Sequence, residues 1–257
     1  MATSENLLAR LDEERRSLDE SGFVREADPR VTRHISRHRR FGFVTWSALP
    51  AADLTAAIER EITFFKPHVD QFEWKTYDHD GPPGLTDALV RAGFKAGESE
   101  TAMVADSATV ATLPLTLPEG IVVRKAKTSA DLADVVAIEN AVWNNDRSSL
   151  AEELGAELRA NPDRLHLYIA ADAGTPVSCA WVRLNRGSAF AGLWGGSTLA
   201  AWRGRGIYRH LLIRRARDAV AAGYPTLYVD ASPDSRPILE RNGFTRLTGT
   251  RPYVYMF

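Results

Sequence analysis

Cysteine is nearly absent from this chain of 257 residues, which contains only Cys179. A single thiol cannot form an internal disulfide or build a cysteine-based zinc site, so the sequence excludes both. The six histidines show no spacing typical of a metal site, and we therefore expect no bound metal.

Long apolar runs and excess charge are also lacking. No stretch of about 18 apolar residues is present, which excludes a membrane-spanning helix, and the N-terminal segment lacks the apolar core of a signal peptide. Lys and Arg total 32 against 33 Asp and Glu, a net charge of −1. We therefore expect a cytoplasmic protein that binds neither nucleic acid nor membranes, and we leave open whether it forms a homodimer.

Apolar residues make up 44% of the chain and charged residues 25%, as is typical of a globular protein with a sizeable core. The length allows one or two domains. Residues 107–120 carry no charge before Glu119 and contain two prolines, features typical of a linker. We predict an N-terminal domain over 1–106, a linker over 107–119 and a C-terminal domain over 120–257.

Helix and strand patterns alternate through the first domain. Leucines at near-helical spacing among charged residues predict an amphipathic helix close to the N-terminus. Residues 51–65 and 85–94 also have helical patterns, and Gly93 is expected to end the second of these helices. Strands are expected at 41–49, 72–77 and 98–106.

A basic cluster lies between the first predicted helix and the strand at 41–49. It could form an anion-binding or nucleic-acid-binding patch, or a solvated surface beside that strand. The near-neutral charge of the chain favours the solvated surface. The cluster comprises Arg33, His34, Arg37, His38, Arg39 and Arg40.

The second domain has a regular order of elements, β-α-α-β-β-β-α-β-α-β, which predicts one α/β domain with a mixed sheet. After a first strand at 121–126, two helices are expected at 129–143, capped by Thr128 or Ser129, and at 148–161. The later strands are expected at 165–172, 177–184, 189–199 and 226–231, and near the C-terminus. The later helices are expected at 206–224 and 235–244.

Two segments, 80–94 and 230–244, match at an offset of 150 residues without a gap. Each contains an Asp, a turn with proline, a helix and the pair Gly-Phe. The match favours two related folds in tandem, although this order of elements also occurs in unrelated α/β proteins. At the same offset Arg203–Gly206 correspond to Asp53–Ala56, so the first copy lacks the glycines and arginines of the second.

The Arg-Gly-Arg-Gly turn at 203–206 precedes the long helix expected from Ile207. Helix N-termini leave N–H groups unpaired and carry partial positive charge. Gly204 and Gly206 would let phosphate oxygens approach these groups, and the two arginines add positive charge. The turn is neither a Walker loop nor a Rossmann fingerprint, and alone it is a weak signal for a pyrophosphate site.

A pair of glycines, Gly195 and Gly196, lies inside the strand at 189–199. Such a pair marks either a bulge or a close packing contact. A bulge would separate this strand from the strand at 226–231, and an extended ligand could then bond the freed backbone of Ser197 to Leu199. A pyrophosphate carried on an extended arm with amide groups describes coenzyme A.

The loop and the later segment S-x-x-S-x-x-x-L-E-R-N-G-F, residues 232–244, resemble the GCN5-related N-acetyltransferases, the GNAT family, in an order of elements that matches over about 120–257. The family's loop pattern R-x-x-G-x-G/A is present, with Tyr208 in place of its last small residue. The resemblance implies the GNAT fold, an α/β fold with a mixed, mostly antiparallel sheet flanked by helices. The N-terminal half resembles a smaller, degenerate copy of the same fold, as in tandem members.

The resemblance also implies acetyl-CoA, or another acyl-CoA, as the acyl donor. By position, Ser197, Thr198 and Leu199 would contact the pantetheine arm, and Ser232 and Ser235 would lie near it. The loop and the start of its helix would hold the pyrophosphate. The residues assigned to that role are Arg203, Gly204, Arg205, Gly206, Ile207, Tyr208 and Arg209.

Two groups that the family often uses for proton transfer are absent here. Leu239 occupies the slot of the tyrosine acid, and the strand at 189–199 has no glutamate base. The candidates to replace them are Glu139, Asp146, Asp230 and Tyr208, and we choose Glu139 and Asp230 as the catalytic residues. Each candidate also has a structural interpretation: an exposed helix position for Glu139, a turn for either aspartate and packing for Tyr208.

The turn at 143–147 would border the acceptor cleft in this fold, so Trp143, Asn145 and Asp146 are the candidate acceptor-binding residues. The sequence thus predicts an N-acetyltransferase that transfers an acyl group to a primary amine of a small molecule or peptide by direct attack. The alternative is a non-catalytic protein that binds or senses acyl-CoA, because the usual acid and base are missing.

Overall fold

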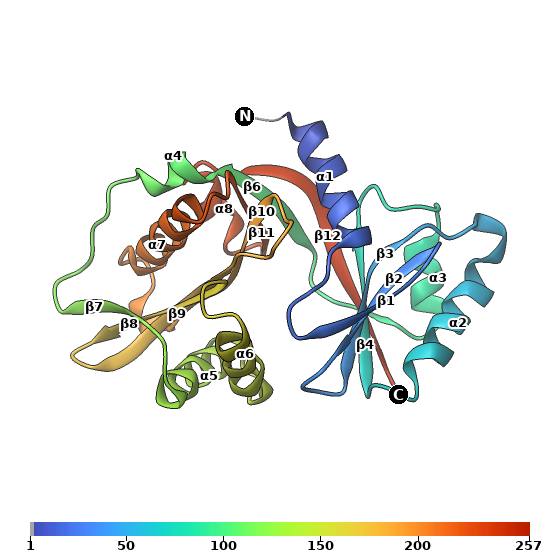
Figure 1. The fold of residues 1–257 in the computed structure, drawn as a ribbon, viewed down its shortest axis with the longest axis horizontal. Helices are drawn as coiled ribbons and strands as arrows, with labels where there is room; N and C mark the ends of the chain where they lie inside the picture. Colours follow the sequence, from blue (N-terminus) through green and yellow to red (C-terminus); the bar gives the residue numbers. More distant parts are fainter. Residues whose placement is uncertain (1–2) are drawn as a thin grey trace. The chain divides into compact units, whose positions relative to one another are not determined.

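A computed structural model describes residues 3–257 (Figure 1). The chain forms two compact units. The first unit comprises the described residues up to Met103 together with Asp230–Pro237 and Arg246–Phe257, and the second comprises Val104–Val229 and Ile238–Thr245. This division differs from the predicted boundary at 107–119, because the C-terminal strand returns to the first unit.

The sheet of the first unit has the strand order β1-β2-β3-β4-β12, with the short β5 also paired to β12. β3 and β4 run parallel, and the other pairs of this unit for which the register is known run antiparallel. β12 joins the unit because Thr250–Met256 pair with Tyr77–Gln71. The bounds are β1 (Phe23–Asp28), β2 (Val31–Ser36), β3 (Phe41–Ser47), β4 (Gln71–Tyr77), β5 (Lys95–Ala96), β6 (Glu100–Asp106) and β12 (Thr245–Met256).

Helices α1 (Ser4–Ser17), α2 (Leu54–Phe65) and α3 (Leu85–Arg91) belong to the same unit (Figure 1). α2 buries an apolar stripe that includes Ile58 and Phe65. These side chains pack on Phe72 and Trp74, which alternate with polar residues along β4 and point to one face of the sheet. The hydrophobic effect of this burial holds the unit together.

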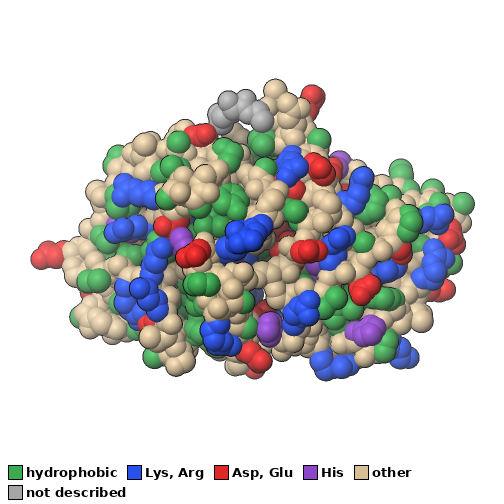
Figure 2. Space-filling view, viewed as in Figure 1, with side chains coloured by type: hydrophobic (Ala, Val, Ile, Leu, Met, Phe, Trp, Pro, Cys, Tyr) green, Lys and Arg blue, Asp and Glu red, His purple; other side chains and the backbone are tan. Residues whose placement is uncertain are grey.

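The basic cluster is not simply a solvated surface, because part of it forms β2 in a hairpin with β1. Arg33 pairs with the buried Glu61 at 2.5 Å, and the His34 ring is 1% exposed and stacks on Phe43. On the face seen in Figure 2, Lys and Arg side chains are interspersed with Asp and Glu.

The second unit contains the strands β7 (Ile121–Lys125), β8 (Leu165–Asp172), β9 (Thr175–Arg183), β10 (Phe190–Thr198) and β11 (Thr226–Ala231). Their order is β11-β10-β9-β8-β7, with β10 and β11 parallel and the other pairs antiparallel. The order of helices and strands agrees with the predicted order, with β12 as the strand near the C-terminus.

Helices cover both faces of this second sheet. α5 (Ser129–Trp143) and α6 (Ser149–Ala160) pack on the face that carries Cys179 and Trp181. α7 (Ile207–Ala221) packs on the opposite face, which carries Tyr168 and Ala180. Thr128 caps α5 as predicted, in a capping box with Asp131. The short helix α8 (Arg236–Glu240) follows β11.

The predicted linker is held to the second unit. Its first residues form helix α4 (Ser107–Ala111), which Asp106 caps by accepting from the Thr109 N–H at 2.7 Å. Side chains of α7 then bind its carbonyls: Arg217 donates to Ala111 O at 3.1 Å and Arg209 to Pro114 O at 2.9 Å. Among the described residues, no helix is both long enough and apolar enough to cross a membrane.

Candidate functional site

The strands β10 and β11 separate part-way along their length. Phe190–Gly192 pair with Thr226–Tyr228, and within residues 3–257 no further register pair joins the two strands. On its other side β10 bulges against β9 between Gly195 and Ser197. The predicted bulge and separation are therefore confirmed.

Close contacts explain why this bulge is built from glycine. Gly195 and Gly196 have φ of +68° and +75°, in the left-handed region. A Cβ on Gly195 would lie 2.3 Å from the Trp181 ring, and one on Gly196 would lie 2.9 Å from Cε2 of Tyr208. Tyr208 thus reaches the bulge from α7, while Trp181 reaches it from β9.

The backbone groups after the bulge point in alternate directions, as in any strand. The Leu199 N–H donates to Val177 O at 3.0 Å, and Ser197 O accepts from the Ser178 hydroxyl at 2.8 Å, so these two groups face β9. Thr198 faces the opposite side, where its carbonyl accepts from Nε of Arg203 at 3.0 Å. The Thr198 N–H is therefore the donor of these residues that faces the open edge.

The loop at 203–206 leaves the start of α7 accessible. Gly206 is the N-cap with φ of +82°, and no side chain caps this helix end. A Cβ on Gly204 or Gly206 would meet no atom within 4 Å. The first N–H groups of α7 are thus available to an anion, with the partial positive charge of the helix terminus behind them.

The arginines around this loop have different surroundings. Arg205 is exposed, and its guanidinium lies 4.6 Å from the ring centroid of Trp202. Arg203 is also exposed, and it binds Thr198 O as described. Arg209 donates to Oδ1 of Asn242 at 2.9 Å. Arg203 and Arg209 therefore hold the loop and helix in place, and Arg205 is free to move toward a ligand.

Glu139 is 1% exposed, so its interpretation as an exposed helix position is wrong. It lies on the sheet-facing side of α5, where Oε2 accepts from Nη1 of Arg147 at 3.2 Å and Oε1 lies 3.7 Å from Sγ of Cys179. Burial and the charge of Glu139 raise the pKa of the Cys179 thiol well above its usual range, so the thiol stays protonated.

The same end of α5 reaches the bulge directly. Nε1 of Trp143 donates to Oγ of Ser197 at 3.2 Å, and Ser197 is the register partner of Cys179. Trp143 and Glu139 are four residues apart and therefore share a face of the helix. A buried carboxylate, an indole and the bulged strand thus meet on the α5 face of the sheet.

The turn after α5 is stabilised by its own polar side chains. Asp146 is exposed and accepts from the backbone N–H of Ser148 at 2.9 Å and from its hydroxyl, which lowers the pKa of Asp146. Oδ1 of Asn145 accepts from Nε of Arg147 at 3.1 Å, and the Arg147 guanidinium lies 5.0 Å from the Trp143 ring centroid. Their predicted role in acceptor binding stays a prediction.

Asp230 is paired with a cation. Nζ of Lys75 lies 3.3 Å from Oδ2 of Asp230 and 2.6 Å from Oε2 of Glu100. Burial alone would lower the pKa of Lys75, but the nearby charges of Asp230, Tyr77 and the glutamates raise it above its usual value. Asp230 is therefore neutralised by a largely buried lysine. Glu139 also has a cationic partner, Arg147, but the side chain of Arg147 is partly exposed to solvent.

Ser232 and Ser235 form the turn that leads into α8. The Ser235 N–H donates to Oγ of Ser232 at 3.3 Å, and the two hydroxyls lie 3.2 Å apart. Leu239 on α8 is fully buried. The slot of the family's tyrosine acid is thus a packed core position in this chain.

Arg215 is the residue of this region that the sequence analysis missed. It is 2% exposed, and its guanidinium donates to Trp194 O at 3.2 Å, Leu211 O at 3.2 Å and Trp181 O at 3.4 Å. A signal was present: Arg215 lies seven residues after Tyr208, so both occupy one face of α7. Leu211 and Ala219, four residues before and after Arg215 on the same face of α7, are apolar and indicate that this face is buried.

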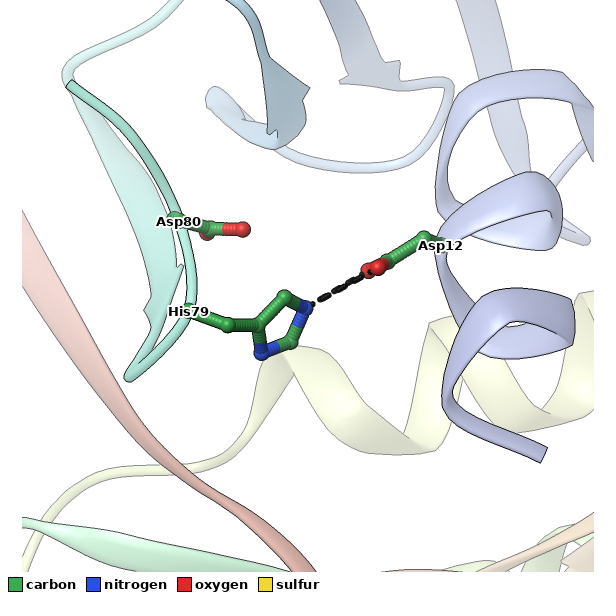
Figure 3. Close-up of side chains that lie close together, drawn as sticks. All are labelled: Asp12, His79 and Asp80. Atoms are coloured by element: carbon green, nitrogen blue, oxygen red, sulfur yellow. Dashed lines mark hydrogen bonds and ion pairs between the residues drawn. The ribbon is translucent and has the colours of Figure 1, made fainter. Parts of the chain in front are cut away.

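Asp12, His79 and Asp80 offer ligand atoms within 4.8 Å of one another (Figure 3). Nε2 of His79 lies 3.0 Å from Oδ1 of Asp12. Arg15 already bridges the two carboxylates, at 2.7 Å from Asp12 and 2.6 Å from Asp80. The guanidinium takes the place that a cation would need, and the group is a salt-bridge network of the first unit.

Residues 132–244 match the sequence model of the Acetyltransferase (GNAT) family. This segment, most of which lies in the second unit, is a GNAT acetyltransferase domain. Acyl transfer is the chemistry of this family, and the chain is an acyltransferase. No curated protein sequence matches the chain.

Solved structures extend the similarity to both units. A GCN5-related N-acetyltransferase from Kribbella flavida is 12% identical with a TM-score of 0.71, covering 99% of this chain and 96% of its own. A tandem GNAT protein from the clavulanic acid biosynthesis pathway is 11% identical with a TM-score of 0.63, covering 99% and 94%. A GCN5-related N-acetyltransferase from Sphaerobacter thermophilus is 15% identical with a TM-score of 0.60, covering 99% and 86%. The whole chain thus has the fold of a tandem GNAT protein.

Proposed function

We propose that the GNAT domain transfers the acetyl group of acetyl-CoA to a primary amine of a small molecule or peptide. The observation that carries this proposal is the coincidence of two features in one place. The N-terminus of α7 is accessible and lacks a side-chain cap, and β10 leaves β11 beside it. One feature suits a pyrophosphate and the other suits an extended arm with amide groups.

The residues fit acetyl-CoA in charge and space. Gly204 and Gly206 leave the approach to α7 open, and Arg205 supplies an exposed guanidinium for phosphate. The Thr198 N–H is the donor on the edge of β10 that an arm would meet. Acetyl-CoA, when bound, supplies an activated thioester.

Glu139 is our choice as the general base. A primary amine with a pKa of about 10.4 is almost wholly protonated at neutral pH and must lose a proton before it attacks. Glu139 lies on the α5 face beside the register pair of Ser197 and Cys179, and it is buried among few polar partners. Through a water molecule its carboxylate can accept the amine proton. Asp230 is a weaker choice because Lys75 already neutralises it.

The acceptor would then enter on the α5 face, next to the turn at 143–147. Trp143 offers an aromatic surface that is 44% exposed, and the backbone at 144–146 offers polar groups to an amine. This placement supports the candidate acceptor residues Trp143, Asn145 and Asp146. We expect their substitution to raise the acceptor KM more than it weakens CoA binding.

Binding of CoA tests the first part of the proposal. Gly206→Glu places a carboxylate at the accessible helix end and should abolish CoA binding in a calorimetric titration. Gly223→Glu is the matched control, because Gly223 has φ of +83° against +82° and also has open space around it. Equal affinity of the two variants would contradict the site.

Turnover tests the second part. Acetyl-CoA consumption against a panel of primary amines should identify an acceptor, and Glu139→Gln should then lower kcat by about 100-fold or more while leaving CoA affinity unchanged. Tight CoA binding without acetylation of any amine in the panel would instead favour the role of an acyl-CoA-binding or sensing protein.

A further inference from the structure

Tyr208 departs from the small residue that the loop pattern has at its position, and the structure places its ring at the bulge. Cε2 of Tyr208 lies 2.9 Å from the position of a Cβ on Gly196, so only glycine leaves room for the ring there. Tyr208 is the second residue of α7 and lies on the face of the sheet opposite α5 and Glu139.

Arg215 brings a positive charge to the same place. Its guanidinium binds Trp194 O, which precedes the bulge, and within the described residues no carboxylate forms an ion pair with it. A buried guanidinium without a carboxylate is costly unless other groups satisfy it. Here three backbone carbonyls do so, and the Tyr208 hydroxyl lies near enough for the two groups to influence each other's pKa. The positive charge of Arg215 therefore lies close to the Tyr208 phenol and to the part of β10 that is not paired with β11.

We propose that the Tyr208 hydroxyl, which lies beside the buried Arg215 at the bulge, donates a proton to the sulfur of the departing coenzyme A. This inference rests on the proposed function, since an arm that runs from the 203–206 loop along the open edge of β10 ends at the bulge. Tyr208 and Arg215 contact that bulge at Gly196 and Trp194.

In the balanced step, the acceptor nitrogen forms a bond to the acyl carbon and the carbon–sulfur bond breaks. The electron pair of that bond stays on sulfur, which takes the Tyr208 proton. Two protons leave the acceptor nitrogen: the ammonium gives one to the base before attack, and the attacking nitrogen gives the second to the base or to water as the amide forms. The Tyr208 phenolate then regains a proton from solvent. Arg215 acts as a positioning residue that stabilises the phenolate between these events. Burial raises the pKa of the Tyr208 phenol, and the hydrogen bond and charge of Arg215 oppose that rise.

Two other proton-bearing side chains of the unit, those of Tyr168 and Cys179, are less suited to this role. The Tyr168 hydroxyl already donates to Asp218 at 2.6 Å. The Cys179 thiol lies on the α5 face beside Glu139, on the side of the base. Leu239, in the slot of the usual acid, has no proton to give.

Equilibrium binding tests the contact without any acceptor. The wild type should bind CoA several-fold more tightly than desulfo-CoA, which lacks the sulfur, as expected for one hydrogen bond. Tyr208→Phe should remove this preference and keep the affinity for desulfo-CoA. Tyr224→Phe, the control, loses a hydroxyl bonded to Asn185 O at 2.8 Å and should keep the preference. Equal affinity of the wild type for both ligands would overturn the inference.

A series of acetyl thioesters with different leaving groups tests the proton transfer, with an acceptor that the amine panel has identified. Tyr208→Phe should lower kcat with acetyl-CoA by about 100-fold, and by only a few-fold with an acetyl thioester of a much more acidic thiol, which needs no acid. Arg215→Lys should behave like a milder version of this variant. A uniform loss with both thioesters would assign Tyr208 to packing and overturn the inference. A wild type without turnover would contradict the proposed function, while the binding comparison still decides whether Tyr208 faces the sulfur.

Discussion

The segments 80–94 and 230–244 fold in the same way, although the first lies within the first unit and the second is divided between the two units. Gly93 and Gly243 have φ of +100° and +91° and end the helices α3 and α8. The Phe94 N–H donates to Leu89 O, and the Phe244 N–H to Leu239 O, both at 3.1 Å. Both phenylalanines are 3% exposed. The two copies share the residues that stop a helix and fill a core.

The copies differ where an anion would bind. α7 begins after Gly206, whose position leaves the helix end open. α2 begins after Asp53, a carboxylate that pairs with Arg60 at 3.1 Å and would repel phosphate. Folding alone therefore does not require the Arg-Gly-Arg-Gly loop, which points to a ligand as the reason for its presence.

The strands at the bulge show the same contrast. β3 also bulges, at Thr45, between the register pairs Thr32–Trp46 and Arg33–Val44. There α1 fills the site: Nε of Arg15 donates to Thr45 O at 2.9 Å, and the Thr45 hydroxyl donates back to Arg15 O at 2.9 Å. In the first unit, helix α1 covers the bulge of β3. In the second unit, the bulge of β10 consists of glycines.

This comparison predicts that CoA binds only to the second unit. Calorimetric titration should give a stoichiometry near one per chain, because Asp53 and α1 occupy the corresponding places in the first unit. Gly206→Glu should remove all binding, and Asp53→Gly should leave it unchanged. A stoichiometry near two, or binding that survives Gly206→Glu, would break the comparison.

The next prediction concerns the glycine that lines the bulge. Gly195→Ala should lower the free energy of unfolding by about 4 kcal/mol, because it combines a left-handed alanine with a 2.3 Å contact to the Trp181 ring. Gly204→Ala has a similar φ of +73° but open space, and should cost only about 1 kcal/mol. Urea unfolding of both variants measures the difference, and equal costs would show that the bulge tolerates a side chain.

Protonation should weaken the first unit in mild acid. Burial lowers the pKa of His34 to about 4, whereas an unfolded histidine titrates near 6.5. The unfolded state binds the proton first, so this contribution to stability is complete above pH ~6.5 and is lost as the pH falls toward 4. The loss is about 3 kcal/mol for a shift of about 2.5 units. His34→Leu should flatten the slope of urea stability in this window, and an unchanged slope would contradict the assignment.

His34 also illustrates what the sequence could not reveal. In the second unit, local sequence patterns predict these features correctly: Thr128 caps α5, and the pair Gly195 and Gly196 marks the bulge of β10. The hairpin of β1 and β2 was hidden by arginines, whose long stems cover a strand while their charged ends reach acids such as Glu61. The burial of His34 depends on Phe43, a contact between strands that no local pattern encodes.

Long-range contacts explain the other differences. α4 is too short for a helical pattern and is held by Arg217 of α7. Glu139 reads as a surface residue because its burial depends on Arg147 and on strand β9. The candidate loop is predictable from its glycines. Among the groups proposed for proton transfer, the sequence offers Glu139 and Tyr208 only as two of four candidates, and it does not indicate Arg215.

Matched substitutions at the tyrosine slot compare the two cores. Leu239→Tyr and Leu89→Tyr each force a larger ring into a position that is 0% exposed. Each should lower the free energy of unfolding by about 2 kcal/mol through overpacking, and Leu239→Tyr should not raise kcat, since Tyr208 already supplies the acid in our proposal. A folded Leu239→Tyr protein with faster acetyl transfer would show that the slot is open to the thioester and that the acid is missing.

The smallest effect is expected at the helix-stopping glycines, where the copies should behave alike. Gly93→Ala and Gly243→Ala each place an alanine at a φ near +90°, and neither added methyl group would meet an atom closer than 3.4 Å. Backbone strain is then the main cost, about 1 kcal/mol in each case. Urea unfolding should show equal losses, and CoA affinity should stay unchanged in Gly93→Ala. A clearly larger loss of unfolding free energy for Gly243→Ala than for Gly93→Ala would contradict this expectation. It would show that the turn before Phe244 contributes more to stability than the turn before Phe94.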